Sequence, residues 1–148
     1  MNVGNICTHN VDVIHQTDCV RLAAERMHDH MVGSLVVVNR RDEPVGILTD
    51  RDLVVRVLAP GRELSETAVE EVMTHCPKTL REESSIDDAL LAMRSGPFRR
   101  IPVVDDKGGL AGLLSLDDVL TYFVQSFSQV RVILEEESPR SLAAAAWM

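Results

Sequence analysis

The sequence predicts an α+β protein in which two β-α-β-β-α repeats pack sheet to sheet and a C-terminal helical extension follows. Three observations lead to this prediction. A constant shift in numbering, which places Gly46 on Gly112, aligns the second half of the chain with the first without a gap. Each half shows the same order of strand-like and helix-like hydrophobic periodicity. Neither half has enough apolar surface for a comfortable core, so we expect the two β faces to form one together.

The repeat is a pair and not an array. Each unit is about sixty residues long, which is longer than a solenoid repeat, and there are only two units. We therefore expect two halves related by a pseudo-twofold axis. The first repeat is placed at residues 1–61, the second at 62–124, and a C-terminal helix and tail at 125–148.

The first half of each unit is a short lead-in, a brief strand and a helix. The lead-in carries Ile6-Cys7-Thr8 in the first repeat and Val72-Met73-Thr74 in the second. Apolar residues at helical spacing predict the helix. Thr17-Asp18 and Ser84-Ser85 stand just before the two helices, where capping side chains are expected. The predicted strands are 11–14 and 78–80, and the predicted helices are 20–31 and 86–93.

The second half of each unit is a pair of strands and a further helix. Runs rich in Val, Ile and Leu predict the strands, and polar turns separate them. Gly108-Gly109 is a good turn signal in the second repeat. The predicted strands are 35–38 with 45–48 and 101–104 with 110–114, and the helices start near Asp52 and Asp118.

A helical extension is predicted from Gln125 to Glu137. Its apolar residues are Phe127, Val130, Ile133 and Leu134, and we expect them to form an oligomer or partner surface. Ser138-Pro139 should end the helix, and the tail after it is expected to be loose.

Composition excludes several classes of protein. The 148 residues include 15 Lys and Arg against 23 Asp and Glu, so the formal net charge is −8 and general nucleic-acid binding is not expected. A hydrophobic content of 45% is too high for a disordered chain. No apolar run approaches the roughly 18 residues of a membrane span, and no signal peptide is visible. Three cysteines are too few for a disulfide scaffold. We expect a cytoplasmic protein.

The same short motif follows a strand and opens a helix in both repeats: Thr49-x-x-Asp52 and Ser115-x-x-Asp118. A helix N-terminus suits a phosphate, the hydroxyl can donate to it, and the carboxylate can accept from two ribose hydroxyls. Gly46 and Gly112 could let the backbone approach a ligand. The alternative is that each motif is only a capping box, and the spacing does not decide between these readings.

The runs 46–52 and 112–118, together with 100–105, resemble tandem CBS domains, the repeats named after cystathionine β-synthase. The resemblance covers residues 3 to about 124. It implies two β-α-β-β-α units packed through their sheets, often as a homodimer. It also implies a regulatory sensor, not a catalyst, that binds AMP, ADP or ATP, or less often S-adenosylmethionine or NAD.

The resemblance also implies two clefts. In each cleft the carboxylate would hold ribose and the hydroxyl would hold phosphate, while the other repeat would supply the base pocket. The first cleft would use Thr49, Asp52, Cys76, Arg81, Phe98 and Arg99. The second would use Asn10, His15, Val32, Ser34, Arg99, Arg100, Ser115 and Asp118.

The two clefts are not expected to be equal. The second has the Arg99-Arg100 pair where the first repeat has Gly33-Ser34, and arginine suits a phosphate. Asp117 opposes a phosphate there, and Arg51 at the equivalent position favours the first cleft. On balance we favour the second. An ion pair with Asp105-Asp106 is the alternative role for the two arginines, and either cleft could be empty and structural.

The sequence thus predicts a regulatory module that senses an adenine nucleotide or a related adenosyl ligand. The alternative is a ligand-free scaffold that acts through dimerisation or through docking to an enzyme or transporter. No residue pattern indicates catalysis, and neither the five histidines nor the cysteines have metal-ligand spacing.

Overall fold

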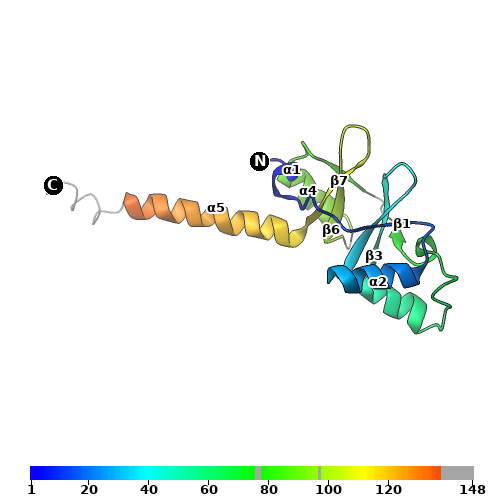
Figure 1. Ribbon diagram of the computed structural model, residues 1–148. Helices are drawn as coiled ribbons and strands as arrows, with labels where there is room; N and C mark the ends of the chain where they lie inside the picture. Colours follow the sequence, from blue (N-terminus) through cyan, green and yellow to red (C-terminus); the bar gives the residue numbers. More distant parts are fainter. Residues whose placement is uncertain (76–77, 97, 138–148) are drawn as a thin grey trace.

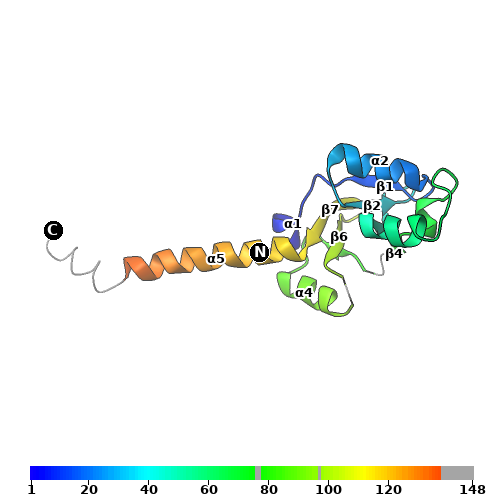
Figure 2. The same cartoon turned by 90° about the horizontal axis from the view of Figure 1, so that it is seen from below.

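The computed structural model describes residues 1–75, 78–96 and 98–137. Two lobes lie side by side, each a small sheet with helices against it, and the last helix projects from the second lobe (Figures 1 and 2). The first part of the chain forms α1 (Val3–Ile6), β1 (Val13–His15), α2 (Val20–His30), β2 (Ser34–Val38), β3 (Pro44–Thr49), α3 (Asp50–Leu53) and the π-helical turn η1 (Val54–Leu58). The second part forms the 3₁₀ turn η2 (Val69–Glu71), β4 (Thr74–His75), β5 (Leu80–Arg81), α4 (Ile86–Arg94), β6 (Arg100–Val104), β7 (Leu110–Ser115) and α5 (Leu116–Glu136).

The two sheets repeat the same topology. In the first, β1 runs parallel to β2, and β2 pairs antiparallel with β3; in the second, β5, β6 and β7 do the same. The register is also repeated, because Gly46 faces Val37 and Gly112 faces Val103, with an irregularity at the following residue in each case. The predicted α+β fold with two β-α-β-β-α units is confirmed.

The central strands explain how the lobes pack. Successive side chains of a strand point to opposite faces. In β2, Leu35 and Val37 belong to the hydrophobic cluster of the first lobe, whereas Val36 and Val38 are equally buried but lie outside that cluster. Ile101 and Val103 of β6 belong in the same way to the second cluster. Each sheet therefore has one face against its own helices and one toward the other lobe. The expected single core is replaced by two clusters and an apolar seam.

The lead-in of each repeat crosses to the other lobe. Val3 and Cys7 pack in the second cluster, and Thr8 exchanges two backbone hydrogen bonds of 2.9 Å with Leu113 of β7. Met73 packs correspondingly in the first cluster, where β4 extends the sheet beside β3. The domain boundaries predicted from the sequence remain predictions, because this exchange interleaves the two halves.

Gly46 and Gly112 make the crossing possible. A Cβ on Gly112 would lie 2.8 Å from Cys7 Sγ, and one on Gly46 would lie 2.4 Å from Met73 Sδ. The sequence analysis expected a ligand to approach the backbone at these glycines. That expectation was wrong, because the crossing lead-in approaches the strand there.

The helix starts predicted from the sequence are confirmed only in part. Ser85 caps α4 as predicted, because its hydroxyl accepts from the N–H of Asp88 at 3.0 Å. The prediction for α2 was wrong: Cys19 is the capping residue and makes no side-chain cap bond, while Asp18 accepts instead from the N–H of His15. The second helices begin at Asp50 and Leu116, two residues earlier than predicted.

The predicted helical extension is present as the C-terminal half of α5, which runs unbroken to Glu136. The predicted helix stop at Ser138-Pro139 and the tail lie outside the described residues.

Candidate functional site

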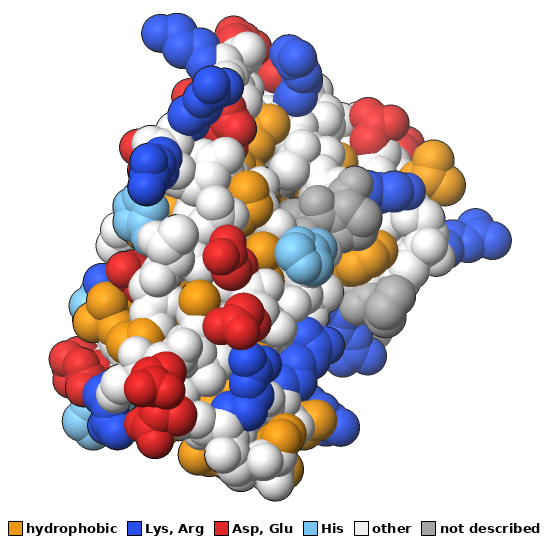
Figure 3. All heavy atoms as spheres, turned by 90° about the vertical axis from the view of Figure 1, so that its right-hand side faces the viewer, with side chains coloured by type: hydrophobic (Ala, Val, Ile, Leu, Met, Phe, Trp, Pro, Cys, Tyr) orange, Lys and Arg blue, Asp and Glu red, His pale blue; other side chains and the backbone are white. Residues whose placement is uncertain are grey.

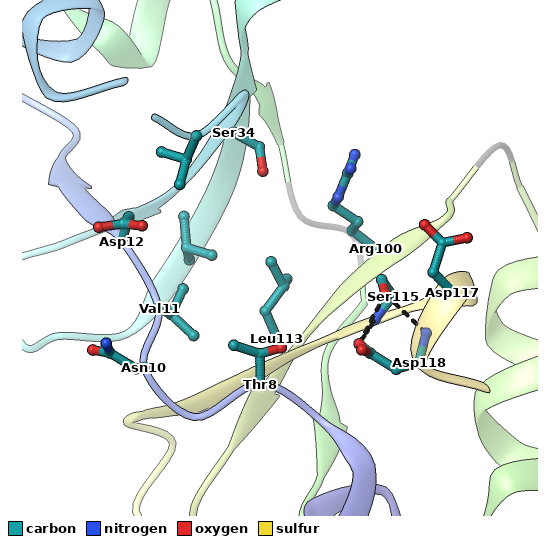
Figure 4. A pocket seen from close by; sticks show the side chains of 12 residues that line it. Thr8, Asn10, Val11, Asp12, Ser34, Arg100, Leu113, Ser115, Asp117 and Asp118 are labelled. Atoms are coloured by element: carbon teal, nitrogen blue, oxygen red, sulfur yellow. Dashed lines mark hydrogen bonds between the residues drawn. The ribbon is translucent and has the colours of Figure 1, made fainter. Parts of the chain in front are cut away.

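A cleft of about 210 Å³ lies at the seam between the two lobes. Figure 4 shows its side chains around an open space, with contributions from the lead-in, β2, β6, β7 and the start of α5. Its lining residues are Thr8, Asn10, Val11, Asp12, Val32, Ser34, Val36, Arg100, Leu113, Ser115, Asp117 and Asp118. The volume is just below the range of typical small-molecule pockets, about 300–1,000 Å³.

Ser115 and Asp118 form a capping box at the start of α5. The N–H and the hydroxyl of Ser115 donate to Asp118 Oδ2 at 2.7 and 2.8 Å, and the N–H of Asp118 donates to Ser115 Oγ at 3.1 Å. All these bonds use one carboxylate oxygen; the other, Oδ1, has no hydrogen bond within the described part of the chain. Capping and ligand binding are thus compatible, because the cap leaves one oxygen available to accept.

Arg100 supplies the positive charge of the cleft. It lies at the start of β6, and its side chain is drawn beside Asp117 in Figure 4. Among the described residues it has no ion pair or side-chain hydrogen bond. The alternative of an ion pair with Asp105-Asp106 is not observed there, because Asp105 accepts from backbone N–H groups and Asp106 pairs with Arg81 at 3.7 Å.

Carboxylates outnumber cations around this cleft. Asp12, Asp117 and Asp118 line it together with the single Arg100. Asp12 is engaged by Nδ1 of His30, whose charge depends on protonation. The balance suits a ligand with little negative charge, since each further phosphate would approach an excess of carboxylates.

Six of the eight residues predicted for the second cleft line it: Asn10, Val32, Ser34, Arg100, Ser115 and Asp118. His15 does not, since it ends β1 on the exposed edge. Arg99 is also exposed and outside the lining, and its carbonyl accepts from the N–H of Leu116.

Sequence reasoning missed several lining residues, chiefly Thr8, Asp12 and Leu113. Thr8 had a signal, because the repeat aligns it with Thr74, but only the crossing of the lead-in shows that it reaches this cleft.

The first predicted cleft is nearly closed. The related hollow has a volume of about 30 Å³, and of the predicted set only Phe98 lines it. Thr49 and Asp52 form the same capping box, but here Arg56 Nε lies 3.8 Å from Asp52 Oδ1, the oxygen that stays unbonded in the second repeat. Arg81 pairs with Glu83 and Asp106 instead of lining this hollow. Arg99 does not line it either, and Cys76 is outside the described residues.

The difference between the clefts follows from side-chain size. The repeat shift places Val32 on Phe98 and Ser34 on Arg100. The second cleft therefore has Val32 where the first has the aromatic ring of Phe98, whereas Arg100 lines both. Arg56 likewise stands where the second repeat has Tyr122, which packs against the second cluster.

The described residues give little support for metal binding or for a reactive cysteine. Among residues 1–75, 78–96 and 98–137, no group of three or more His, Cys, Asp or Glu side chains is arranged to hold a metal ion. Burial, followed by the charges of Glu82 and Asp118, raises the pKa of the Cys7 thiol, which disfavours the reactive thiolate.

Two surface observations bear on possible partners. Acidic and basic side chains are interspersed over the face shown in Figure 3. None of the described helices combines the length and apolarity that a membrane crossing requires.

Two interleaved repeats with a polar-edged cleft at their seam define the class of protein: a tandem-repeat module with a cleft between its halves. Residues 3–59 and 69–125 both match the CBS domain. The chain therefore belongs to the CBS domain family, as a tandem pair.

Known proteins agree with this assignment. The chain is 32% identical over 140 residues to the uncharacterized protein MK0525 of Methanopyrus kandleri, covering 93% of this chain and 71% of that protein. It is similar in structure to Hypoxic Response Protein I, solved with two coordinated zinc ions (TM-score 0.73, 26% identity, 82% and 98% of the two chains). It is also similar to CBSX2 in complex with AMP (TM-score 0.69, 27% identity, 84% and 96%).

Proposed function

We propose that this protein is a regulatory module that binds an adenine nucleotide, or a related adenosyl ligand, in the cleft between its repeats. The observation that carries the proposal is the turn at Ser115 and Asp118, which lines a cleft and keeps one carboxylate oxygen available after capping the helix. The AMP complex of CBSX2 supports the ligand class. No catalytic step is part of the proposal.

The proposed binding mode follows from the lining residues. Asp118 Oδ1 would accept from the ribose hydroxyls, and Arg100 would hold the phosphate near the start of α5. The hydroxyl of Ser115 would join Arg100 by turning its proton from Asp118 Oδ2 to the phosphate. Val32 and Val36 offer apolar contact for a base. Since the cleft has one arginine and three aspartates, AMP should bind more tightly than ADP or ATP. S-Adenosylmethionine and NAD are further candidates.

Under this proposal only the second cleft would bind a ligand. In the first repeat Arg56 occupies the side of Asp52 that a ribose would need, and the adjoining hollow is about seven times smaller, 30 against 210 Å³. We therefore expect one ligand per chain.

Regulation would result from differential affinity. The cleft takes residues from both lobes, so a ligand that contacts both stabilises one relative arrangement of the lobes. A partner, which could be an enzyme or a transporter, would respond if it prefers that arrangement.

Asp118→Asn, with Asp52→Asn as matched control, tests the proposal by titration calorimetry with AMP, ATP, NAD and S-adenosylmethionine. Loss of a charged hydrogen-bond acceptor should weaken binding to Asp118→Asn by about tenfold or more. Asp52→Asn should keep wild-type affinity. A purely capping role would lower the unfolding free energy by about 1 kcal/mol in both variants and leave affinity unchanged. No heat and no melting shift with millimolar ligand would contradict the proposal.

A ligand-free scaffold is the second candidate. It is favoured by the exposed apolar residues along α5, such as Phe127 and Leu134, which are 73% and 63% exposed. An empty cleft in the native protein, combined with a stable assembly, would favour this role.

A further inference from the structure

Beyond its first two turns, which pack against the second lobe, helix α5 is largely exposed among the residues that the structure describes. Of its 21 residues only Val119 is buried, and both ribbon views show the C-terminal half extending away from the lobes (Figures 1 and 2). The match to the CBS domain ends at residue 125, so this half lies beyond it. An isolated helix gains little stability in water without packing of its apolar face, so the sequence of that face is informative.

A regular apolar stripe runs along this helix. It consists of Leu120, Phe123, Phe127, Val130 and Leu134, and we call it the α5 stripe. Their spacing alternates between three and four residues, which is the heptad pattern of a two-stranded coiled coil. They are 53%, 38%, 73%, 51% and 63% exposed. Such a seam is buried best by another helix with the same repeat.

We propose that the α5 stripe pairs in antiparallel orientation with α5 of a second copy of this chain. Pairing about a twofold axis near residue 125 places Phe123 beside Phe127 of the second copy. It also places Leu120 beside Val130 of the second copy, so both of these layers of the seam are apolar.

Charge selects the antiparallel orientation. Arg131, which pairs with Glu135 of its own helix at 2.8 Å, and Asp117 both flank the seam, at equivalent heptad positions two heptads apart. In the antiparallel pair Arg131 lies beside Asp117 of the second copy, whereas parallel pairing separates them. Parallel pairing would also bring two acidic ends together, since Glu135 and Glu136 end α5 and its last turn has no basic residue.

The α5 stripe has enough apolar area to hold two copies of the chain together. Covering its exposed side chains on both copies, together with Val124 and Ile133, would remove on the order of 1,000 Å² from water, close to the lower limit of a specific interface. The proposal does not rest on the proposed function, although Asp117 also lines the cleft.

A matched pair of valines tests the proposal. Val130 and Val132 are 51% and 53% exposed on the same helix, but two residues correspond to more than half a turn, so Val132 lies off the stripe. Sedimentation and light scattering should show a dimer for the wild-type chain and for Val132→Glu. Val130→Glu should weaken association at least tenfold, because it buries a charge in the seam.

Charge reversal tests the orientation. Arg131→Asp should weaken the dimer, and adding Asp117→Arg should restore it by recreating the opposite-charge contact. A monomeric wild type at about 100 μM would overturn the proposal and assign the stripe to the chain's own residues after 137 or to a different protein. Equal effects of Val130→Glu and Val132→Glu, or a dimer unaffected by both, would also overturn it.

Discussion

Replacement of Gly112 by alanine should destabilise the protein through the crossing lead-in. A Cβ at this position would lie 2.8 Å from Cys7 Sγ and 2.9 Å from the carbonyl oxygen of Thr8. Neither neighbour can retreat easily. Cys7 is packed in the second hydrophobic cluster, and the Thr8 carbonyl accepts a 2.9 Å hydrogen bond from the N–H of Leu113.

The magnitude follows from overpacking. An extra methyl group in a close-packed site costs about 1–3 kcal/mol of unfolding free energy. Alanine also restricts the unfolded chain and so returns about 0.4–1 kcal/mol. A net loss of about 1–2 kcal/mol is expected for Gly112→Ala. Ligand affinity should fall as well, because Thr8 lines the cleft.

Urea unfolding, followed by circular dichroism, measures the effect. Gly109→Ala is the control, since its Cβ would meet only the side-chain oxygens of Asp105, the nearest at 3.2 Å. The control should stay within about 0.5 kcal/mol of wild type. Wild-type stability of Gly112→Ala would refute the argument that close approach of the lead-in requires glycine. A loss of the same size in Gly109→Ala would attribute the effect to the β6–β7 hairpin in general.

Two further predictions concern helix capping and thiol reactivity. Ser85→Ala should cost about 1 kcal/mol at neutral pH, because it removes the cap of α4. Hydrogen bonds from the side chain and then the backbone of Ser85 lower the pKa of the Asp88 carboxyl. The part of the stabilisation that depends on the ionised carboxylate is therefore present above the ordinary pKa of aspartate and is lost as pH falls through the lowered value. Acid titration of both proteins should show the difference between their stabilities becoming smaller below about pH 4, and a constant difference would contradict it. The raised pKa of Cys7 should displace its alkylation by iodoacetamide to higher pH in the folded protein than in urea; equal pH profiles by peptide mass spectrometry would contradict it.

The candidate site was predictable where it depends on local order along the chain. Ser115 and Asp118 follow a strand and open a helix, and both repeats show the pattern. The structure confirms that this motif opens a helix in both repeats, with Thr49 and Ser115 as the capping residues. Their role toward a ligand stays a prediction, because a capping box and a ribose site need the same residue types at the same spacing.

The crossing of the lead-in was not predictable in this way. Asp12 and Thr8 reach the second cleft only because the lead-in crosses to the other lobe. Arg56 stands four residues after Asp52, a spacing that favours an ion pair on a helix, so this contact could have been predicted although the sequence analysis did not make the prediction. The crossing of the lead-in depends instead on contacts between segments distant in sequence.

The sequence by itself determined the duplication, the order of helices and strands, and the apolar stripe of α5, because periodicity and capping are properties of neighbouring residues. Only the tertiary structure decided that each lobe has its own cluster, that the glycines serve the crossing lead-ins, and that one seam is open while its twin is nearly filled. The physical reason is that close packing depends on the volumes of residues that meet across the pseudo-twofold axis, such as Val32 in one cleft and Phe98 in the other.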